Sequence, residues 1–200
     1  NPEIFITNKE IQWAEDFMVE QKIDPLKKLV VIHPSASQDY KNWGLERFTV
    51  LSRRLIHDHG HQVLCCFPEK EQSIAKLLLD QVEGIFVYLG PLRQSMALIS
   101  KADLMIDSAS GPSHISSALN IPTLVLMGPQ DIKNTYYDKD IHKAKGLLFY
   151  QEVPCRDLFM SRCLPPNPCQ NRICMDHSVE NVLKKSLELL RTSSRTSHRD

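Results

Sequence analysis

The sequence predicts an α/β fold built on a doubly wound, Rossmann-like parallel sheet. Short apolar runs rich in β-branched residues alternate with helix-length amphipathic segments, which is the pattern of βαβ crossovers. The content of 42% hydrophobic and 24% charged residues is that of a globular domain. A length of 200 residues suits one such domain, or one and a half.

The elements are expected in a regular order. Thr7 and Glu10 have the spacing of a capping box and introduce the first helix, and Ser178 is the expected cap of the last one. The expected strands cover 29–33, 62–67, 85–90, 102–107, 122–128 and 146–150, and the expected helices cover 8–22, 45–59, 69–82, 94–101, 112–119 and the segment after 178. Six strands with these connections fit the sheet order 3-2-1-4-5-6. The tail 191–200 has no apolar residue and is expected to be disordered.

Charge and composition exclude several functions. The 24 basic and 24 acidic residues give a net charge of +0, which argues against nucleic-acid binding through bulk charge and against a polybasic membrane anchor. The longest apolar runs are far shorter than the roughly 20 residues that a spanning helix needs. The sequence opens on Asn1-Pro2 without Met or a signal peptide, so we expect part of a longer, cytoplasmic polypeptide.

The six cysteines fall into two groups. Cys65 and Cys66 lie in an apolar run and are expected to be buried. The other four lie in a Pro-rich segment without a C-x-x-C pair, and three readings stay open: a structural zinc site, two disulfides, or a packed loop. These four are Cys155, Cys163, Cys169 and Cys174.

A ligand site is expected where the strand order reverses, at the carboxyl ends of the first and fourth strands. The loops that leave these strands contain HPSAS at 33–37 and SASGPSH at 108–114. In the second loop, Ser110, Gly111 and the following Pro suit the start of a helix whose free N–H groups face a phosphate, and His114 could donate to the same phosphate. The alternative is an ordinary capped helix with a surface histidine.

The first loop adds further phosphate-binding groups. Ser35 and Ser37 carry hydroxyls, and Lys41 is a natural counter-charge for a phosphate. The chain has neither a G-x-G-x-x-G nor a G-x-x-x-x-G-K-[ST] motif, which argues against a dinucleotide oxidoreductase and a P-loop NTPase.

Together these motifs resemble a known family. HPSAS, then KNW at 41–43, DSASGPSH at 107–114, GPQD at 128–131 and CM at 174–175 occur in the order found in glycosyltransferase family 9, the bacterial heptosyltransferases. The resemblance covers about 29–190 and is to the C-terminal, nucleotide-sugar-binding domain of the two-domain GT-B architecture. It implies that 1–28 is an interdomain linker containing the first helix.

The resemblance also implies a reaction and its partners. The donor would be an ADP-sugar, the acceptor a lipid A-core molecule held by an N-terminal domain that carries the catalytic base, and the displacement inverting and free of metal or other cofactors. No nucleic acid is implied, and the location would be cytoplasmic with peripheral contact to the inner membrane.

The resemblance assigns roles to individual residues. Ser37 and Lys41 would contact the diphosphate, Glu71 the ribose, and the stretch from Gly90 to Leu92 the adenine. Ser110, Gly111 and His114 would bind phosphate.

The chain departs from the family at two of these positions. Ser35 stands where the family has Gly, and Ala109 stands where the family has an Asp that touches the donor sugar; Asp131 could replace that Asp. The departure at 109 leaves three hypotheses open: the donor domain of a transferase of heptose or a related sugar, a transferase of the same fold that uses another nucleotide sugar, and a degenerate nucleotide-binding or interaction module.

Overall fold

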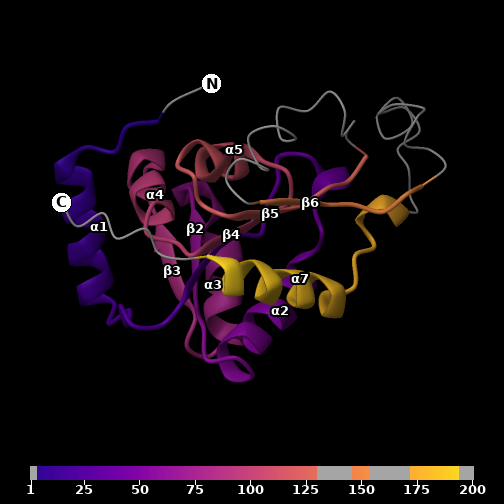
Figure 1. Ribbon diagram of the computed structural model, residues 1–200, viewed down its shortest axis with the longest axis horizontal. Helices are drawn as coiled ribbons and strands as arrows, with labels where there is room; N and C mark the ends of the chain where they lie inside the picture. Colours follow the sequence, from indigo (N-terminus) through magenta and orange to yellow (C-terminus); the bar gives the residue numbers. More distant parts are fainter. Residues whose placement is uncertain (1–3, 130–145, 154–171, 194–200) are drawn as a thin grey trace.

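A six-stranded parallel sheet forms the centre of the molecule (Figure 1). The computed structural model describes residues 4–129, 146–153 and 172–193. The strand order is β3-β2-β1-β4-β5-β6, as the sequence predicts, and every neighbouring pair is parallel. The strands are β1 (Leu29–His33), β2 (Gln62–Phe67), β3 (Phe86–Leu89), β4 (Leu104–Asp107), β5 (Thr123–Leu126) and β6 (Leu147–Phe149).

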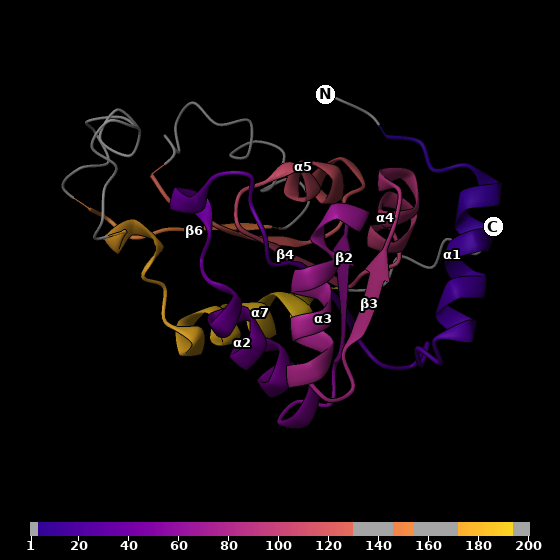
Figure 2. The same cartoon turned by 180° about the vertical axis from the view of Figure 1, so that it is seen from behind.

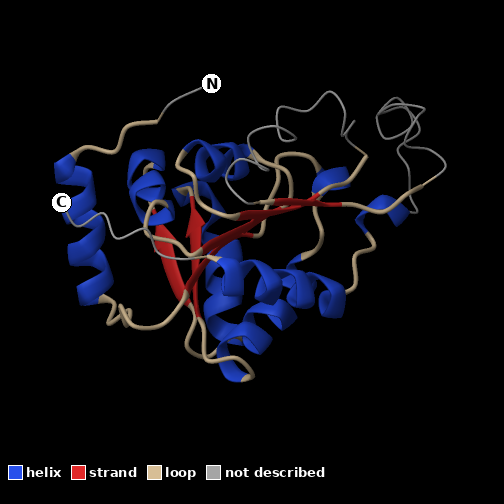
Figure 3. Cartoon of the chain, in the orientation of Figure 1, coloured by secondary structure: helices blue, strands red, loops and turns tan. Residues whose placement is uncertain are grey.

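Helices cover both faces of the sheet (Figures 2 and 3). One face packs against α2 (Leu45–His57), α3 (Gln72–Gln81) and α7 (Val179–Thr192). The other packs against α1 (Asn8–Glu20), α4 (Leu92–Ile99) and α5 (Gly111–Ala118). Short 3₁₀ turns, η1 (Asp39–Lys41), η2 (Glu69–Glu71) and η5 (Ile173–Met175), complete the described elements.

The burial of β1 on both faces explains why its residues 29–32 are all apolar. Val30 and Ile32 point into the core beneath α2, α3 and α7, whereas Leu29 and Val31 point into the core beneath α1, α4 and α5. All four side chains are completely buried. Successive residues of a strand face opposite sides, so a sheet covered by helices on both sides needs apolar residues at every position.

The element ends differ slightly from the prediction. Thr7 forms the expected capping box with Glu10, and the Ser178 hydroxyl accepts from the Asn181 amide. The expected helix 69–82 begins as the 3₁₀ turn η2, because the first turn of a helix often tightens in this way. The expected helix 94–101 is α4, which begins earlier, directly after Pro91. Helix α7 continues to Thr192, into the expected tail, of which 194–200 lie outside the described residues.

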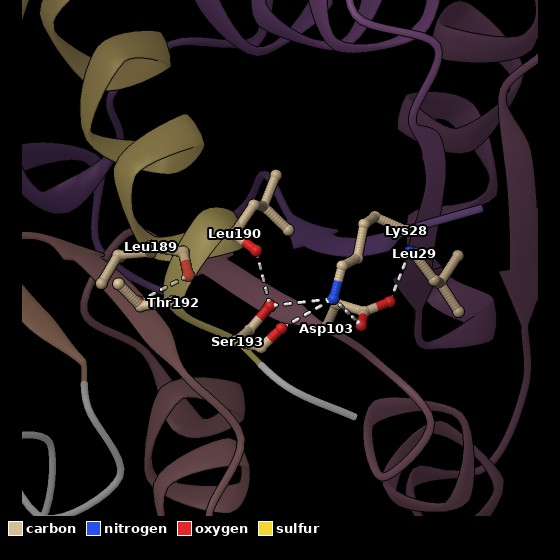
Figure 4. A network of polar contacts seen from close by, with 7 residues as sticks. All are labelled: Lys28, Leu29, Asp103, Leu189, Leu190, Thr192 and Ser193. Carbon is tan, nitrogen blue, oxygen red and sulfur yellow. Dashed lines mark hydrogen bonds and ion pairs between the residues drawn. The ribbon is translucent and has the colours of Figure 1, made fainter. Parts of the chain in front are cut away.

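A half-buried ion pair fastens the amino-terminal ends of β1 and β4 to the end of α7 (Figure 4). Lys28 Nζ lies 3.0 Å from Asp103 Oδ1 and donates to the Ser193 carbonyl at 2.7 Å. The second oxygen of Asp103 accepts from the Leu29 amide at 2.8 Å. The Asp103 side chain is fully buried, so its charge depends on these partners. The network lies at the end of the strands away from the loops after β1 and β4.

No helix among the described residues is both long enough and apolar enough to cross a lipid bilayer.

Candidate functional site

The carboxyl ends of β1 and β4 open into one cavity of about 550 Å³. His33 and Asp107 end these strands and are paired in register, so the loops that follow start side by side. Eight of the nine binding residues expected from the sequence line this cavity, and the ninth, Asp131, lies outside the described residues. The eight are Ser35, Ser37, Lys41, Glu71, Leu92, Ser110, Gly111 and His114.

Asp107 holds the loop between β4 and α5 in a tight turn. Its carboxylate is fully buried and accepts from the Ser110 amide at 2.7 Å, the Ser110 hydroxyl at 2.7 Å and the Ser113 amide at 3.2 Å. Ala109 between them has a φ of +49°, a conformation that costs a residue with a Cβ about 1 kcal/mol or more. The carboxylate therefore both caps α5 and stabilises the strained turn at Ala109.

This arrangement corrects the expectation of a helix start with free donors. Ser110 is the N-cap residue, as expected, but its amide and that of Ser113 are already hydrogen-bonded to Asp107. Pro112 has no N–H, so Gly111 supplies the one amide of the first turn without a hydrogen bond to the described residues. A phosphate at this helix would consequently meet fewer backbone donors than the motif predicts.

Two lysines supply positive charge on the other side of the cavity. Lys41 lies at the end of η1, with its Nζ 6.0 Å from the centre of the Tyr40 ring. Lys70 lies in η2, just after β2. The sequence prediction did not include Lys70, because the strand-order rule was applied only to the loops after the first and fourth strands and the family resemblance pointed to the adjacent Glu71 alone. The loop after the neighbouring second strand opens at the same edge of the sheet and would have pointed to it.

His33, Ser35 and Glu71 form a hydrogen-bonded triad on one wall of the cavity. His33 Nδ1 donates to the Cys66 carbonyl at 3.0 Å, and His33 Nε2 lies 3.2 Å from Ser35 Oγ. Ser35 Oγ donates to Glu71 Oε2 at 2.6 Å. Ser35 thus holds the Glu71 carboxylate at the cavity, and His33 contacts the same hydroxyl.

Apolar groups form another part of the lining. Phe67, Met105 and Ile99 contribute buried apolar side chains, while Leu92 at the edge is 61% exposed. Burial raises the pKa of the Cys66 thiol to about 12, so this thiol stays protonated and is no nucleophile at neutral pH. This wall suits a flat apolar group such as a heterocyclic base.

The hypothesis of a structural zinc site concerns a segment that is largely outside the described residues. Cys155, Cys163 and Cys169 lie there, and Cys174 is buried in η5. Within 4–129, 146–153 and 172–193, no three His, Cys, Asp or Glu side chains are grouped so as to hold a metal ion.

Comparison with known proteins identifies the family. The profile of glycosyltransferase family 9 (heptosyltransferase) matches residues 6–158. The chain belongs to this family. The matched range includes the strands β1 to β6 and all loops that line the cavity.

Curated relatives and solved structures that are similar to this chain include further heptosyltransferases and family 9 proteins. The lipopolysaccharide core heptosyltransferase OpsX of Haemophilus influenzae is 31% identical over 134 residues, which are 62% of this chain and 35% of the relative. The family 9 glycosyl transferase of Veillonella parvula superposes with a TM-score of 0.77 at 18% identity, covering 94% of this chain and 53% of that one. The E. coli ADP-heptose LPS heptosyltransferase II gives 0.69 at 19% identity, covering 95% and 54%. The chain therefore spans between about a third and slightly more than half of the length of these proteins.

Proposed function

We propose that this chain is the donor-binding domain of a family 9 heptosyltransferase and that its cavity holds an ADP-sugar. The observation that carries the proposal is the gathering of eight sequence-predicted residues around one cavity at the strand-order reversal. The nucleotide-sugar domain corresponds to 29–190, preceded by an interdomain linker over 1–28. ADP-heptose is the donor we infer, because the similar E. coli protein is an ADP-heptose LPS heptosyltransferase.

The lining suggests where each part of an ADP-sugar lies. Lys41 and Lys70 neutralise the diphosphate, with the Gly111 amide and His114 on the α5 side. Glu71 accepts hydrogen bonds from the ribose hydroxyls, and the adenine packs on the apolar wall near Leu92.

The two lysines are also placed to assist the nucleotide diphosphate as the leaving group. Negative charge grows on the diphosphate as its bond to the anomeric carbon breaks, and Lys41 and Lys70 stabilise that charge without a metal ion. We assign the inverting displacement, the catalytic base and the lipid A-core acceptor to the complete protein, with the base outside this chain. Such a protein would work at the cytoplasmic face of the inner membrane.

A second function is favoured by a specific observation. Ala109 carries no group for a donor sugar, and the neighbouring Asp107 is fully engaged with Ser110 and Ser113. These features favour a module that binds a nucleotide and transfers nothing. The two functions differ in whether the full-length protein releases ADP from ADP-heptose in the presence of an LPS acceptor.

Calorimetric titration of the chain with ADP-heptose, ADP and adenosine tests the proposal. We expect ADP-heptose to bind, and Lys41→Ala to weaken ADP about tenfold or more while adenosine is unchanged, because the lost contact is to phosphate. Lys101→Ala is the matched control, since Lys101 pairs with Glu15 away from the cavity. Absence of binding at millimolar ligand, or equal weakening of ADP and adenosine, would refute the assignment.

A further inference from the structure

The His33–Ser35–Glu71 triad has a proton requirement that follows from its geometry. A backbone carbonyl only accepts, so His33 Nδ1 must carry a hydrogen to bond the Cys66 carbonyl. In a neutral imidazole the other nitrogen, Nε2, is then an acceptor. Ser35 has one hydroxyl hydrogen, and it lies between this Nε2 and the Glu71 carboxylate, both of which need a donor.

The three hydrogen bonds form together only if one proton is added. If Ser35 donates to Glu71, then Nε2 must donate to Ser35 and His33 is an imidazolium. If Ser35 donates to Nε2, then Glu71 must be protonated and donate to Ser35. Both arrangements contain the same number of protons, one more than a neutral imidazole with an ionised carboxylate.

Without the extra proton, the triad loses one of its bonds. The Ser35 hydroxyl then donates its hydrogen to either Nε2 or Glu71, and its lone pairs face the other acceptor. The hold of the protein on Glu71 consequently depends on pH.

We propose that His33 is a positioning residue, which holds the Glu71 carboxylate through Ser35, and that nucleotide binding in the cavity is coupled to proton uptake by this triad. The coupling rests on the proposed function, because it takes a nucleotide diphosphate as the ligand.

The charges around the triad explain the direction of the coupling. Lys41 and Lys70, which line the same cavity together with His114, oppose the addition of a proton while the cavity is empty. A bound diphosphate neutralises the two lysines, so the extra proton is then favoured. Asp107, beside His33 in the sheet, is occupied by α5, and the exposed Glu69 adds a carboxylate next to Lys70.

The ligand-free protein tests the triad itself. The isosteric Glu71→Gln variant can donate from its amide to Ser35, so Ser35 can donate to Nε2 of a neutral His33 and complete all three bonds without the extra proton. In the structure Ser35 donates to Glu71, which is the arrangement with an imidazolium, so we expect ¹⁵N shifts of the His33 ring at pH 6 to report two protonated nitrogens in the native chain and one in Glu71→Gln. Equal protonation of the ring in the two proteins, together with a ¹³C carboxyl shift of an ionised Glu71 in the native chain, would exclude both arrangements and overturn the proposed triad.

Calorimetry tests the coupling. ADP-heptose is titrated in buffers of different ionisation enthalpy between pH 6 and pH 8.5, and its diphosphate diester has no ionisation of its own in this range. We expect proton uptake by the native chain and by the control His57→Gln on the exposed end of α2, with a Kd that rises up to about tenfold per pH unit. His33→Gln removes the imidazole of the triad and should show clearly less uptake than either of these proteins, with a flatter pH profile.

Each outcome bears on one part of the argument. Binding without proton uptake, or equal uptake by His33→Gln, overturns the coupling and leaves the proposed function standing. Failure of ADP-heptose to bind at all overturns the proposed function, and the coupling with it, while the ring shifts of the ligand-free protein still decide whether the triad exists.

Discussion

Replacing Asp107 by alanine is expected to destabilise the fold and, at the same time, to open the start of α5 to anions. The substitution removes the acceptor of three hydrogen bonds, from the Ser110 amide, the Ser110 hydroxyl and the Ser113 amide. It also leaves the φ of +49° at Ala109 without its support.

The magnitude follows from these contacts. Hydrogen bonds to a charged group contribute about 1.5 kcal/mol or more each, so the loss of three costs at least about 4.5 kcal/mol. For a chain of this size, that corresponds to a fall in Tm of roughly 10–15 °C. Asp107→Asn keeps the size and one acceptor oxygen for the two amides, and it should cost only about 1–2 kcal/mol.

Thermal unfolding with increasing sulfate is the assay. In Asp107→Ala the two released amides and the start of the helix can bind an anion, so sulfate should raise the Tm of this variant more than that of the native chain. Asp80→Ala, on the exposed side of α3, is the matched control and should change neither quantity. A variant at 107 with native Tm and native response to sulfate would refute the capping role.

Three further predictions concern the rest of the molecule. Lys28→Ala removes the cation paired with the buried Asp103 carboxylate and should lower the free energy of unfolding, measured with denaturant, by about 2 kcal/mol. Lys101→Ala breaks a surface pair with Glu15 and should lower it by well under 1 kcal/mol. Equal effects of the two substitutions would contradict the network of Figure 4. The hydrogen bonds from the Arg93 guanidinium and the Thr7 amide lower the pKa of Glu10 from 4.5 to about 2. The stabilisation of the folded state by the ionised Glu10 is therefore present above pH 4.5 and is lost as the pH falls toward 2. An NMR titration of Glu10 that is unchanged in Arg93→Ala would show that this ion pair is not formed. Burial raises the pKa of both adjacent thiols, that of Cys66 to about 12, so a thiol-specific disulfide reagent at pH 8 should modify Cys65 and Cys66 only after unfolding. The modified residues are identified by peptide mass spectrometry, because the chain has four other cysteines, and rapid modification of Cys65 or Cys66 in the native chain would contradict their placement.

The order of the strands in the sheet could be predicted because it depends on two features that the sequence shows directly, the apolar runs and the lengths of the connections between them. Runs such as LVVIH at 29–33 are apolar at every position, which only a strand covered on both faces requires, and short connections with right-handed crossovers leave few possible orders. Element ends depend on details that the pattern does not carry. The helix that begins at Leu92 directly after Pro91, and the 3₁₀ turn before α3, are examples.

The site was predictable in its location more than in its chemistry. The strand-order rule leads to the loops after 33 and 107, and the cavity lies there. The occupation of the α5 amides by Asp107 was not predictable, because it depends on the turn at Ala109 bending the chain back on its own preceding carboxylate. The contact of Ser35 with Glu71 joins residues 36 positions apart, and sequence spacing does not encode such a contact.

Mapping of ADP onto the chain by NMR tests the central claim most directly, namely that the cavity after β1 and β4 is the nucleotide site. We predict saturable amide shift changes at Ser37, Lys41, Lys70, Gly111 and His114, all of which line the cavity, with no change along the outer faces of α2 and α7. Lys41→Ala should reduce these changes at equal ADP concentration. Shift changes that centre elsewhere on the molecule, or none at millimolar ADP, would contradict the account.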